Sequence, residues 1–307
     1  MKVNRRNFIV SSAAATAGLT AGCASVTPRD RSWIDAHVHV WTPDTRRYPL
    51  AAGYARKDMV PGSFTPEELF LLSRPEGVTR TVLIQMSFYQ YDNRYMLDTM
   101  KRFPGVFGGV AIIDENEPDV RGRMKRLAEQ GVRGFRLYAF RKNTSGWASS
   151  SGMREMWRVG AEAGLAMCCL TDPDALPDIT RMCRDHPETP VVIDHFARIG
   201  MRGAADPNQL DQLLALSKYR RTHVKTSAFY ALGKKQPPYA DLGPMIRRLR
   251  DSFGAERLMW ATDCPYQASA PHTYADSIAL IRDRLEFLSA SDRQWMLRGT
   301  AEKLFFA

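Results

Sequence analysis

The stretch that decides the fold is Trp-Ile-Asp-Ala-His-Val-His at residues 33–39. Its apolar residues predict a strand, and its two histidines stand two positions apart. Because side chains alternate along a strand, we expect His37 and His39 on one side, with Asp35 on the same face but deeper in. Two inward histidines are costly to bury without partners, so this strand end predicts a polar site. A purely structural role, as satisfied core histidines, is the alternative.

Seven further apolar, β-rich runs follow, and polar segments with helical spacing separate them. The eight runs cover 33–39, 78–86, 106–113, 132–138, 165–170, 191–193, 224–226 and 258–261. Residues 291–304 predict a closing helix with Asp292 as its cap. Eight strand–helix units predict a single α/β domain, a (β/α)8 TIM barrel. An open doubly wound sheet is the alternative, weakened because no Gly-rich dinucleotide or phosphate loop follows any run.

Composition narrows the classes of function. The 307 residues suit one barrel, whose typical size is about 250 residues. A hydrophobic fraction of 44% with 25% charged residues is typical of a soluble globular protein. The formal net charge is +10, yet the basic residues form no long run, so we expect no nucleic-acid partner. We expect the arginines to serve a small anionic substrate, and the oligomeric state is left open.

The first residues have the features of an export signal. Arg5 and Arg6 precede a stretch of small and apolar residues that is too short to span a bilayer, which resembles a twin-arginine signal. The residues around Cys23 also resemble a lipoprotein cleavage box. We therefore expect a periplasmic protein that contacts the membrane only through a lipid on Cys23. The expected organisation is a signal at 1–22, a linker at 23–31 and the barrel at 32–307.

Polar residues at the ends of the other predicted strands point to chemistry. Catalysis in this type of barrel takes place at the carboxyl ends of the strands. His195 ends the sixth run and Asp263 the eighth, where a carboxylate can act as a general base on water or as a metal ligand. Arg136 and Tyr138 end the fourth run, and Arg198 follows the sixth. These cations can hold a carboxylate or polarise a carbonyl.

Six motifs occur in order after residue 32. They are D-A-H-V-H-V-W (35–41), Q-M-S-F-Y-Q-Y-D-N (85–93), V-R-G-F-R-L-Y (132–138), V-V-I-D-H-F-A-R (191–198), V-K-T-S (224–227) and L-M-W-A-T-D-C-P (258–265). The set resembles the lactonase branch of the amidohydrolase superfamily, which includes 2-pyrone-4,6-dicarboxylate lactonase and L-fuconolactonase-like proteins. The resemblance covers nearly the whole chain after residue 32 and implies a barrel of the metal-dependent-hydrolase type.

The resemblance implies a hydrolase that opens a cyclic ester, a lactone of a sugar acid or of an aromatic-breakdown intermediate. Asp263 would take a proton from water, and three histidines would surround and polarise the carbonyl. The residues predicted to be catalytic are thus His37, His39, His195 and Asp263. The residues predicted to bind substrate are Ser87, Arg136 and Arg198 from the resemblance and Tyr138 from its strand end.

The same resemblance bears on a cofactor. Two-metal members of the superfamily carry a lysine on the fourth strand and a histidine on the fifth, and this chain has neither there. We expect no required metal, with a single Zn2+ held by His37, His39 and Asp263 as the alternative. A zinc-dependent amidohydrolase or decarboxylase, a non-catalytic periplasmic binding protein and a structural lipoprotein remain the other hypotheses.

Overall fold

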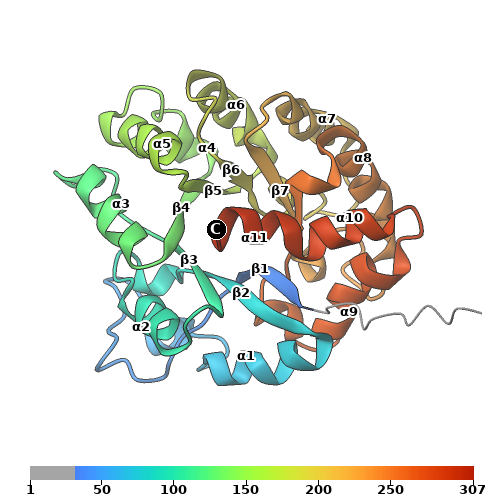
Figure 1. Cartoon of the computed structure of the whole chain (residues 1–307), viewed down its shortest axis with the longest axis horizontal. Coiled ribbons are helices and arrows are strands. Elements are labelled where there is room, and N and C mark those ends of the chain that lie inside the picture. Colours follow the sequence, from blue (N-terminus) through green and yellow to red (C-terminus); the bar gives the residue numbers. More distant parts are fainter. Residues whose placement is uncertain (1–31) are drawn as a thin grey trace, which may run out of the picture. The chain divides into compact units, whose positions relative to one another are not determined.

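The computed structural model describes residues 32–307, which form a ring of eight parallel strands surrounded by helices (Figure 1). The strands follow one another around the ring in chain order, from β1 to β8. An open doubly wound sheet would reverse its strand order at a switch point, and this ring does not. The prediction of a (β/α)8 barrel is therefore confirmed.

The strands are β1 (Trp33–Val38), β2 (Val78–Ile84), β3 (Phe107–Ala111), β4 (Val132–Ala139), β5 (Ala166–Thr171), β6 (Val191–Ile193), β7 (Thr222–Thr226) and β8 (Leu258–Trp260). The helices are α1 (Pro66–Ser73), α2 (Arg94–Arg102), α3 (Val120–Glu129), α4 (Arg141–Thr144), α5 (Ser151–Ala163), α6 (Leu176–Asp185), α7 (Pro207–Leu214), α8 (Gly243–Phe253), α9 (Tyr274–Ala279), α10 (Ala290–Gln294) and α11 (Thr300–Phe305). Every predicted run overlaps one observed strand, with small differences at the ends.

Capping residues set the ends of several helices. Thr65 caps α1: its hydroxyl accepts from the N–H of Glu68, whose carboxylate accepts in return from the N–H of Thr65. The predicted cap at Asp292 is wrong. Ser289 caps α10, and Asp292 is the third helical residue, where its carboxylate accepts from the Ser289 N–H. A capping box puts the acid inside the helix and the hydroxyl residue three positions earlier, which explains the correction.

The ring closes between β1 and the segment that follows β8. Val38 forms a parallel bridge with Cys264. The N–H of Asp263 donates to the His37 carbonyl and the N–H of His39 donates to the Cys264 carbonyl, both at 2.9 Å. We call this contact the seam. It brings the end of the first strand and the residues just after the last strand side by side.

Asp35 does not share the face of the two histidines, and that prediction is wrong. The pairing of β1 with β2 shifts register between Asp35 and Val38, which breaks the simple alternation of side chains. Asp35 accepts hydrogen bonds from the Thr262 hydroxyl at 2.6 Å and from the Tyr274 hydroxyl of α9 at 2.9 Å. Burial raises the pKa of Asp35 to about 6.

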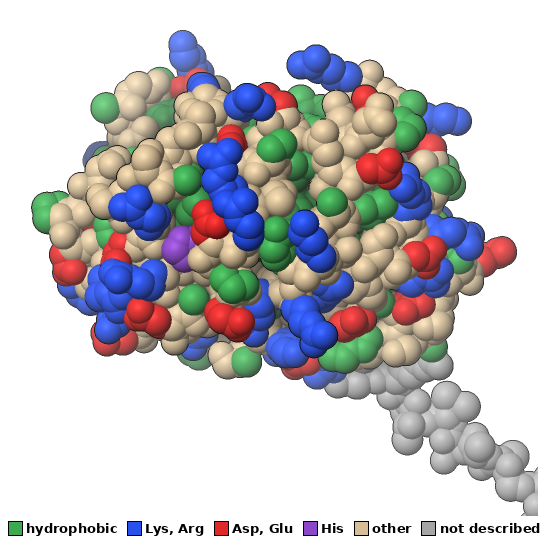
Figure 2. Space-filling model, turned by 90° about the horizontal axis from the view of Figure 1, so that it is seen from above, with side chains coloured by type: hydrophobic (Ala, Val, Ile, Leu, Met, Phe, Trp, Pro, Cys, Tyr) green, Lys and Arg blue, Asp and Glu red, His purple; other side chains and the backbone are tan. Residues whose placement is uncertain are grey.

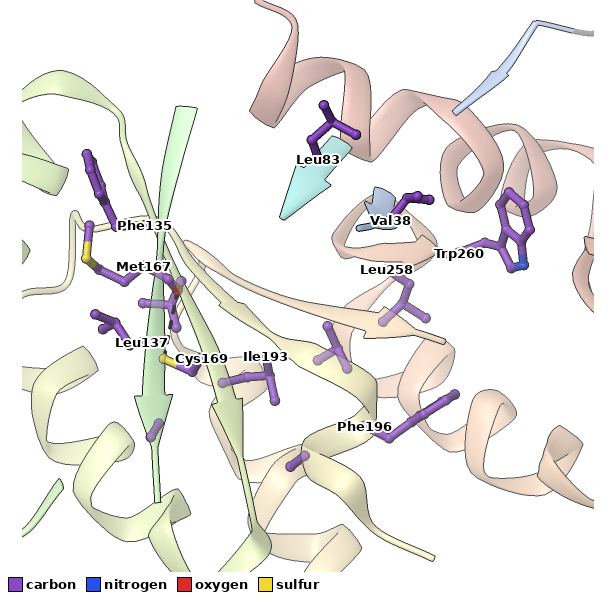
Figure 3. Packing of buried hydrophobic residues seen from close by; sticks show 14 of the residues in the cluster. Val38, Leu83, Phe135, Leu137, Met167, Cys169, Ile193, Phe196, Leu258 and Trp260 are labelled. Atoms are coloured by element: carbon purple, nitrogen blue, oxygen red, sulfur yellow. Dashed lines mark hydrogen bonds between the residues drawn. The ribbon is translucent and has the colours of Figure 1, made fainter. Parts of the chain in front are cut away.

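The hydrophobic core has a large outer layer between strands and helices and a smaller inner layer within the ring. Figure 3 shows outer-layer side chains, among them Phe135 and Met167 of neighbouring strands. The inner layer includes Phe305, a residue of α11. Helix α11 crosses the ring in Figure 1. Gly108 near the start of β3 permits this approach, because a Cβ there would lie 2.8 Å from the Phe305 carbonyl oxygen. Helix α11 thus covers the amino-terminal end of the ring and leaves the carboxyl end for chemistry.

Basic and acidic side chains are interspersed on the face of the molecule that Figure 2 shows. Within residues 32–307, no helix combines the length and the apolar character needed to cross a membrane. The predicted signal at 1–22, the linker at 23–31 and the lipid on Cys23 lie outside the described residues.

Candidate active site

Three side chains at the seam form the centre of the candidate site. Asp263 Oδ1 lies 3.4 Å from His37 Nε2 and 3.3 Å from His39 Nε2, and all three residues are buried. The His39 Nδ1 lies 2.9 Å from the Ile84 carbonyl. Because a carbonyl only accepts, Nδ1 carries a proton, and Nε2 presents a lone pair toward Asp263 when the ring is neutral. In that neutral state, His39 Nε2 and Asp263 Oδ1 are two acceptors that face a common point, which suits a molecule that donates to both.

His195 approaches the same carboxylate from the turn after β6. Residues 195–198 all have φ between 51° and 59°, a left-handed run that costs L-residues about 1–2 kcal/mol each. The His195 Nδ1 lies 2.8 Å from the Ser227 hydroxyl, and its Nε2 lies 3.8 Å from Asp263 Oδ2. Burial lowers the pKa of His195, so its ring is neutral at neutral pH. Strained turns of this kind concentrate at functional sites, where surrounding packing holds them.

Asp263 has the surroundings of a general base. Burial alone would raise the pKa of Asp263, but His195, His39 and His37 lower it below its ordinary value, so the carboxylate is ionised. The Tyr230 hydroxyl donates to Asp263 Oδ2 at 2.7 Å. Burial and the charge of Asp263 raise the pKa of Tyr230 far above its ordinary value, so the phenol keeps its proton.

A buried ion cluster supports these groups from within the barrel. Lys225 Nζ lies 3.0 Å from Asp194 Oδ1 and 3.1 Å from His37 Nδ1. Arg136 Nη1 lies 3.4 Å from Asp194 Oδ2 and 3.2 Å from His37 Nε2. Burial and Lys225 lower the pKa of His37, while Lys225 and His37 hold the pKa of Asp194 low despite its burial. Together with Asp263, the cluster has two carboxylates and two basic side chains.

A cavity of about 410 Å³ opens over this cluster, and we call it the catalytic cavity. The predicted site residues that line it are His39, His195, Asp263, Ser87, Arg136, Tyr138 and Arg198. His37 is fully buried beneath them. Arg198 forms an ion pair with Asp172 at 3.1 Å and lies over the Phe140 ring, so its charge is shared before any substrate arrives.

His37, His39 and Asp263 lie close enough together to bind one metal ion, but the charges around them do not favour a divalent cation. His37, His39 and Asp263 each offer one ligand atom, and these atoms lie within 4.8 Å of one another. A histidine ligand must present a lone pair to the ion. Each ring nitrogen of His37 lies beside a basic donor, Lys225 Nζ or Arg136 Nη1, which competes with an ion for the lone pair. A divalent ion would also add charge to a cluster that Lys225 and Arg136 already balance.

Sequence reasoning missed Tyr230 and Ser227, which hold Asp263 and His195 from the loop after β7. Ser227 belongs to the V-K-T-S motif, so its place directly after a strand was a usable signal. Tyr230 depends on the left-handed turn at Ala228, where φ is 56°, and no local pattern marks that turn. Functional loops are hard to predict because backbone geometry, rather than composition, aims their side chains.

Residues 34–307 match the amidohydrolase family, and the chain belongs to that family. It is 28% identical to the L-fucono-1,5-lactonase of Burkholderia ambifaria, over 78% of this chain and 82% of that protein. It is 26% identical to a 2-pyrone-4,6-dicarboxylate hydrolase of Comamonas testosteroni, over 80% of each chain. A Pseudomonas putida structure described as a 2-pyrone-4,6-dicarboxylic acid hydrolase superposes with a TM-score of 0.74 at 26% identity, covering 90% of this chain and 97% of that one. The predicted membership is confirmed, and the protein is a hydrolase.

Proposed function

We propose that the protein is a lactonase that hydrolyses the cyclic ester of a small anionic acid. The observation that carries the proposal is the pair of acceptors, Asp263 Oδ1 and His39 Nε2, only 3.3 Å apart beside the catalytic cavity. A water molecule can donate one hydrogen to each of them. The relatives named for hydrolysis of a fuconolactone and of a pyrone support a lactone as the substrate.

In the first step, Asp263 removes a proton from this water as its oxygen attacks the lactone carbonyl. The carbonyl π electrons move onto the carbonyl oxygen, which becomes an oxyanion. In the tautomer that this step requires, the Ser227 hydroxyl donates to His195 Nδ1 and the His195 Nε2–H donates to that oxygen. The buried guanidinium of Arg136 adds positive charge in a site largely shielded from water, where such stabilisation is strongest.

In the second step, the ester bond to the ring oxygen breaks as the carbonyl re-forms. The departing oxygen needs a proton. Tyr230 lines the catalytic cavity, and its hydroxyl donates to Asp263. Tyr230 gives its proton to the ring oxygen and takes the proton that Asp263 removed from water. Both side chains return to their starting states, and the product is the open hydroxy acid.

Substrate binding uses the residues around the mouth of the catalytic cavity. We propose that Arg136 and Arg198 attract an anionic group, with hydroxyl contacts from Ser87 and Tyr138. Arg198 must be shared between the substrate and Asp172, so its contribution to affinity is smaller than that of an unpaired arginine.

The test is hydrolysis of a panel of sugar-acid and pyrone lactones by the purified protein, with acid release followed and metal content measured. Turnover that survives chelation and disappears in Asp263→Asn is the expected result. A second candidate, a mononuclear zinc amidohydrolase or decarboxylase, is favoured by the close approach of three ligand atoms. It predicts one zinc per chain and activity lost on chelation. Ligand binding without any turnover would instead indicate a binding protein.

We also propose that the chain is exported to the periplasm by the twin-arginine route and anchored through a lipid on Cys23. The sequence features of residues 1–22 support this proposal. Fractionation of cells that express the full chain, combined with labelling by a radioactive fatty acid, tests both parts. A Cys23→Ser variant should be exported and lose the label. Retention of the wild-type chain in the cytoplasm would contradict the proposal.

A further inference from the structure

A second cavity adjoins the catalytic cavity at the carboxyl end of the barrel. Its volume is about 580 Å³, and we call it the side cavity. The two cavities share three lining residues, Ser87, Arg136 and Tyr138. These three side chains therefore form a common wall between the two spaces. A ligand that occupies one cavity can therefore extend past Tyr138 into the other.

The side cavity exposes aromatic surface that the fold does not use. Tyr54 is 37% exposed and Tyr91 is 46% exposed, and both line this cavity. Few large hydrophobic side chains of residues 32–307 are this exposed, and these two border the same space. Tyrosines at such positions present a flat apolar face and a polar tip, which suits contact with a ring.

The side cavity also contains polar groups without a protein partner. Lys142 and Glu115 both line it, and neither side chain forms a hydrogen bond or an ion pair with the other described residues. Arg198 in the catalytic cavity differs, because Asp172 already pairs with it. Unpaired polar groups beside aromatic faces are the usual lining of a small-molecule site.

We propose that the side cavity is a substrate subsite, and that the natural substrates are lactones carrying a second ring. The lactone ring occupies the catalytic cavity, and the second ring lies against Tyr54 and Tyr91 with polar substituents toward Lys142 and Glu115. The inference rests on the proposed lactonase activity and narrows its substrate class. The two cavities together reach the upper part of the roughly 300–1,000 Å³ range of ligand pockets, more space than a single ring fills.

The test compares a single-ring δ-lactone with the same lactone bearing an aryl ring. Glu115→Trp places an indole in the side cavity and should lower kcat/KM for the aryl lactone by about tenfold or more, mainly through KM. Tyr91→Ala removes one aromatic contact and should lower it by roughly 2- to 10-fold. Neither variant should change kcat/KM for the single-ring lactone by more than about twofold. Trp295→Ala, which removes an aromatic of similar exposure (38%) outside both cavities, is the matched control.

Selective loss of activity on the aryl lactone in both variants supports the subsite. Equal losses on both substrates, or a wild-type protein that does not prefer the aryl lactone, would overturn it. A wild-type protein that hydrolyses neither lactone overturns the lactonase proposal itself, so the two failures are distinguishable.

Discussion

Replacement of Tyr230 by Phe tests the proton path of the proposed reaction. The change removes one oxygen, the donor that lies 2.7 Å from Asp263 Oδ2, and keeps the ring that packs near Tyr266. A hydrogen bond to a charged group contributes about 1.5–3 kcal/mol, which corresponds to roughly 10- to 150-fold in rate if it is lost only in the transition state. Proton transfer by a positioned side chain contributes typically 10²- to 10⁴-fold. We therefore expect a loss of about 10²-fold or more when the leaving oxygen needs a proton.

The assay is kcat/KM for lactones that differ in the acidity of the leaving oxygen. A sugar lactone releases an alkoxide, which is strongly basic and needs the proton. A lactone whose ring oxygen is bonded directly to an arene releases a phenolate, whose conjugate acid has a pKa near 10, and its kcat/KM should fall by only about fivefold. Tyr266→Phe is the control, because Tyr266 lines the same cavity and, within residues 32–307, its hydroxyl does not hydrogen-bond to Asp263. Equal losses on both substrates would refute proton donation and leave Tyr230 as a residue that only positions Asp263.

Three further outcomes are expected. Asp263→Asn should lower kcat by about 10²- to 10⁴-fold with an unchanged circular dichroism spectrum, because the amide cannot accept the water proton. Lys225→Met should reduce the free energy of unfolding by about 3–5 kcal/mol in urea titrations, because it leaves a buried carboxylate without its ammonium partner; if the urea midpoint does not move, the buried ion pair is not stabilising. Folding lowers the pKa of His37 and of His195, so the unfolded chain binds protons more readily and stability should decrease as the pH drops below about 6.5. Asp35, whose pKa is raised to about 6, offsets part of this loss between pH 6 and 4. A free energy of unfolding that rises from pH 7 to pH 5 would contradict the sign.

The strands and the residues at their ends could be predicted because both depend on local patterns. Apolar runs indicate the eight strands. Polar residues at the carboxyl ends of several runs then predict which side chains face the site. This reasoning placed His195 and Asp263 within reach of each other, as the 3.8 Å separation of their side chains shows. The prediction of these two residues did not depend on the conformation of any loop.

The rest of the site depends on geometry that the sequence does not display. Asp35 left its expected face because a register shift in β1 interrupts the alternation. Tyr230 reaches Asp263 through a left-handed turn, and Lys225 meets Asp194 only because β6 and β7 are neighbours in a closed ring. Each of these contacts joins residues whose relative positions the closed barrel determines.

The seam carries a consequence for how activity arises during folding. The proposed base and its two histidine neighbours come from opposite ends of the barrel sequence, and they meet only through the backbone pairing of the first strand with the segment after the last. Contacts between such distant parts of a chain are among the slowest to form. In a partly folded barrel the strands can be present while Asp263 is still separated from His37 and His39. Hydrolysis should therefore begin only when the ring has closed.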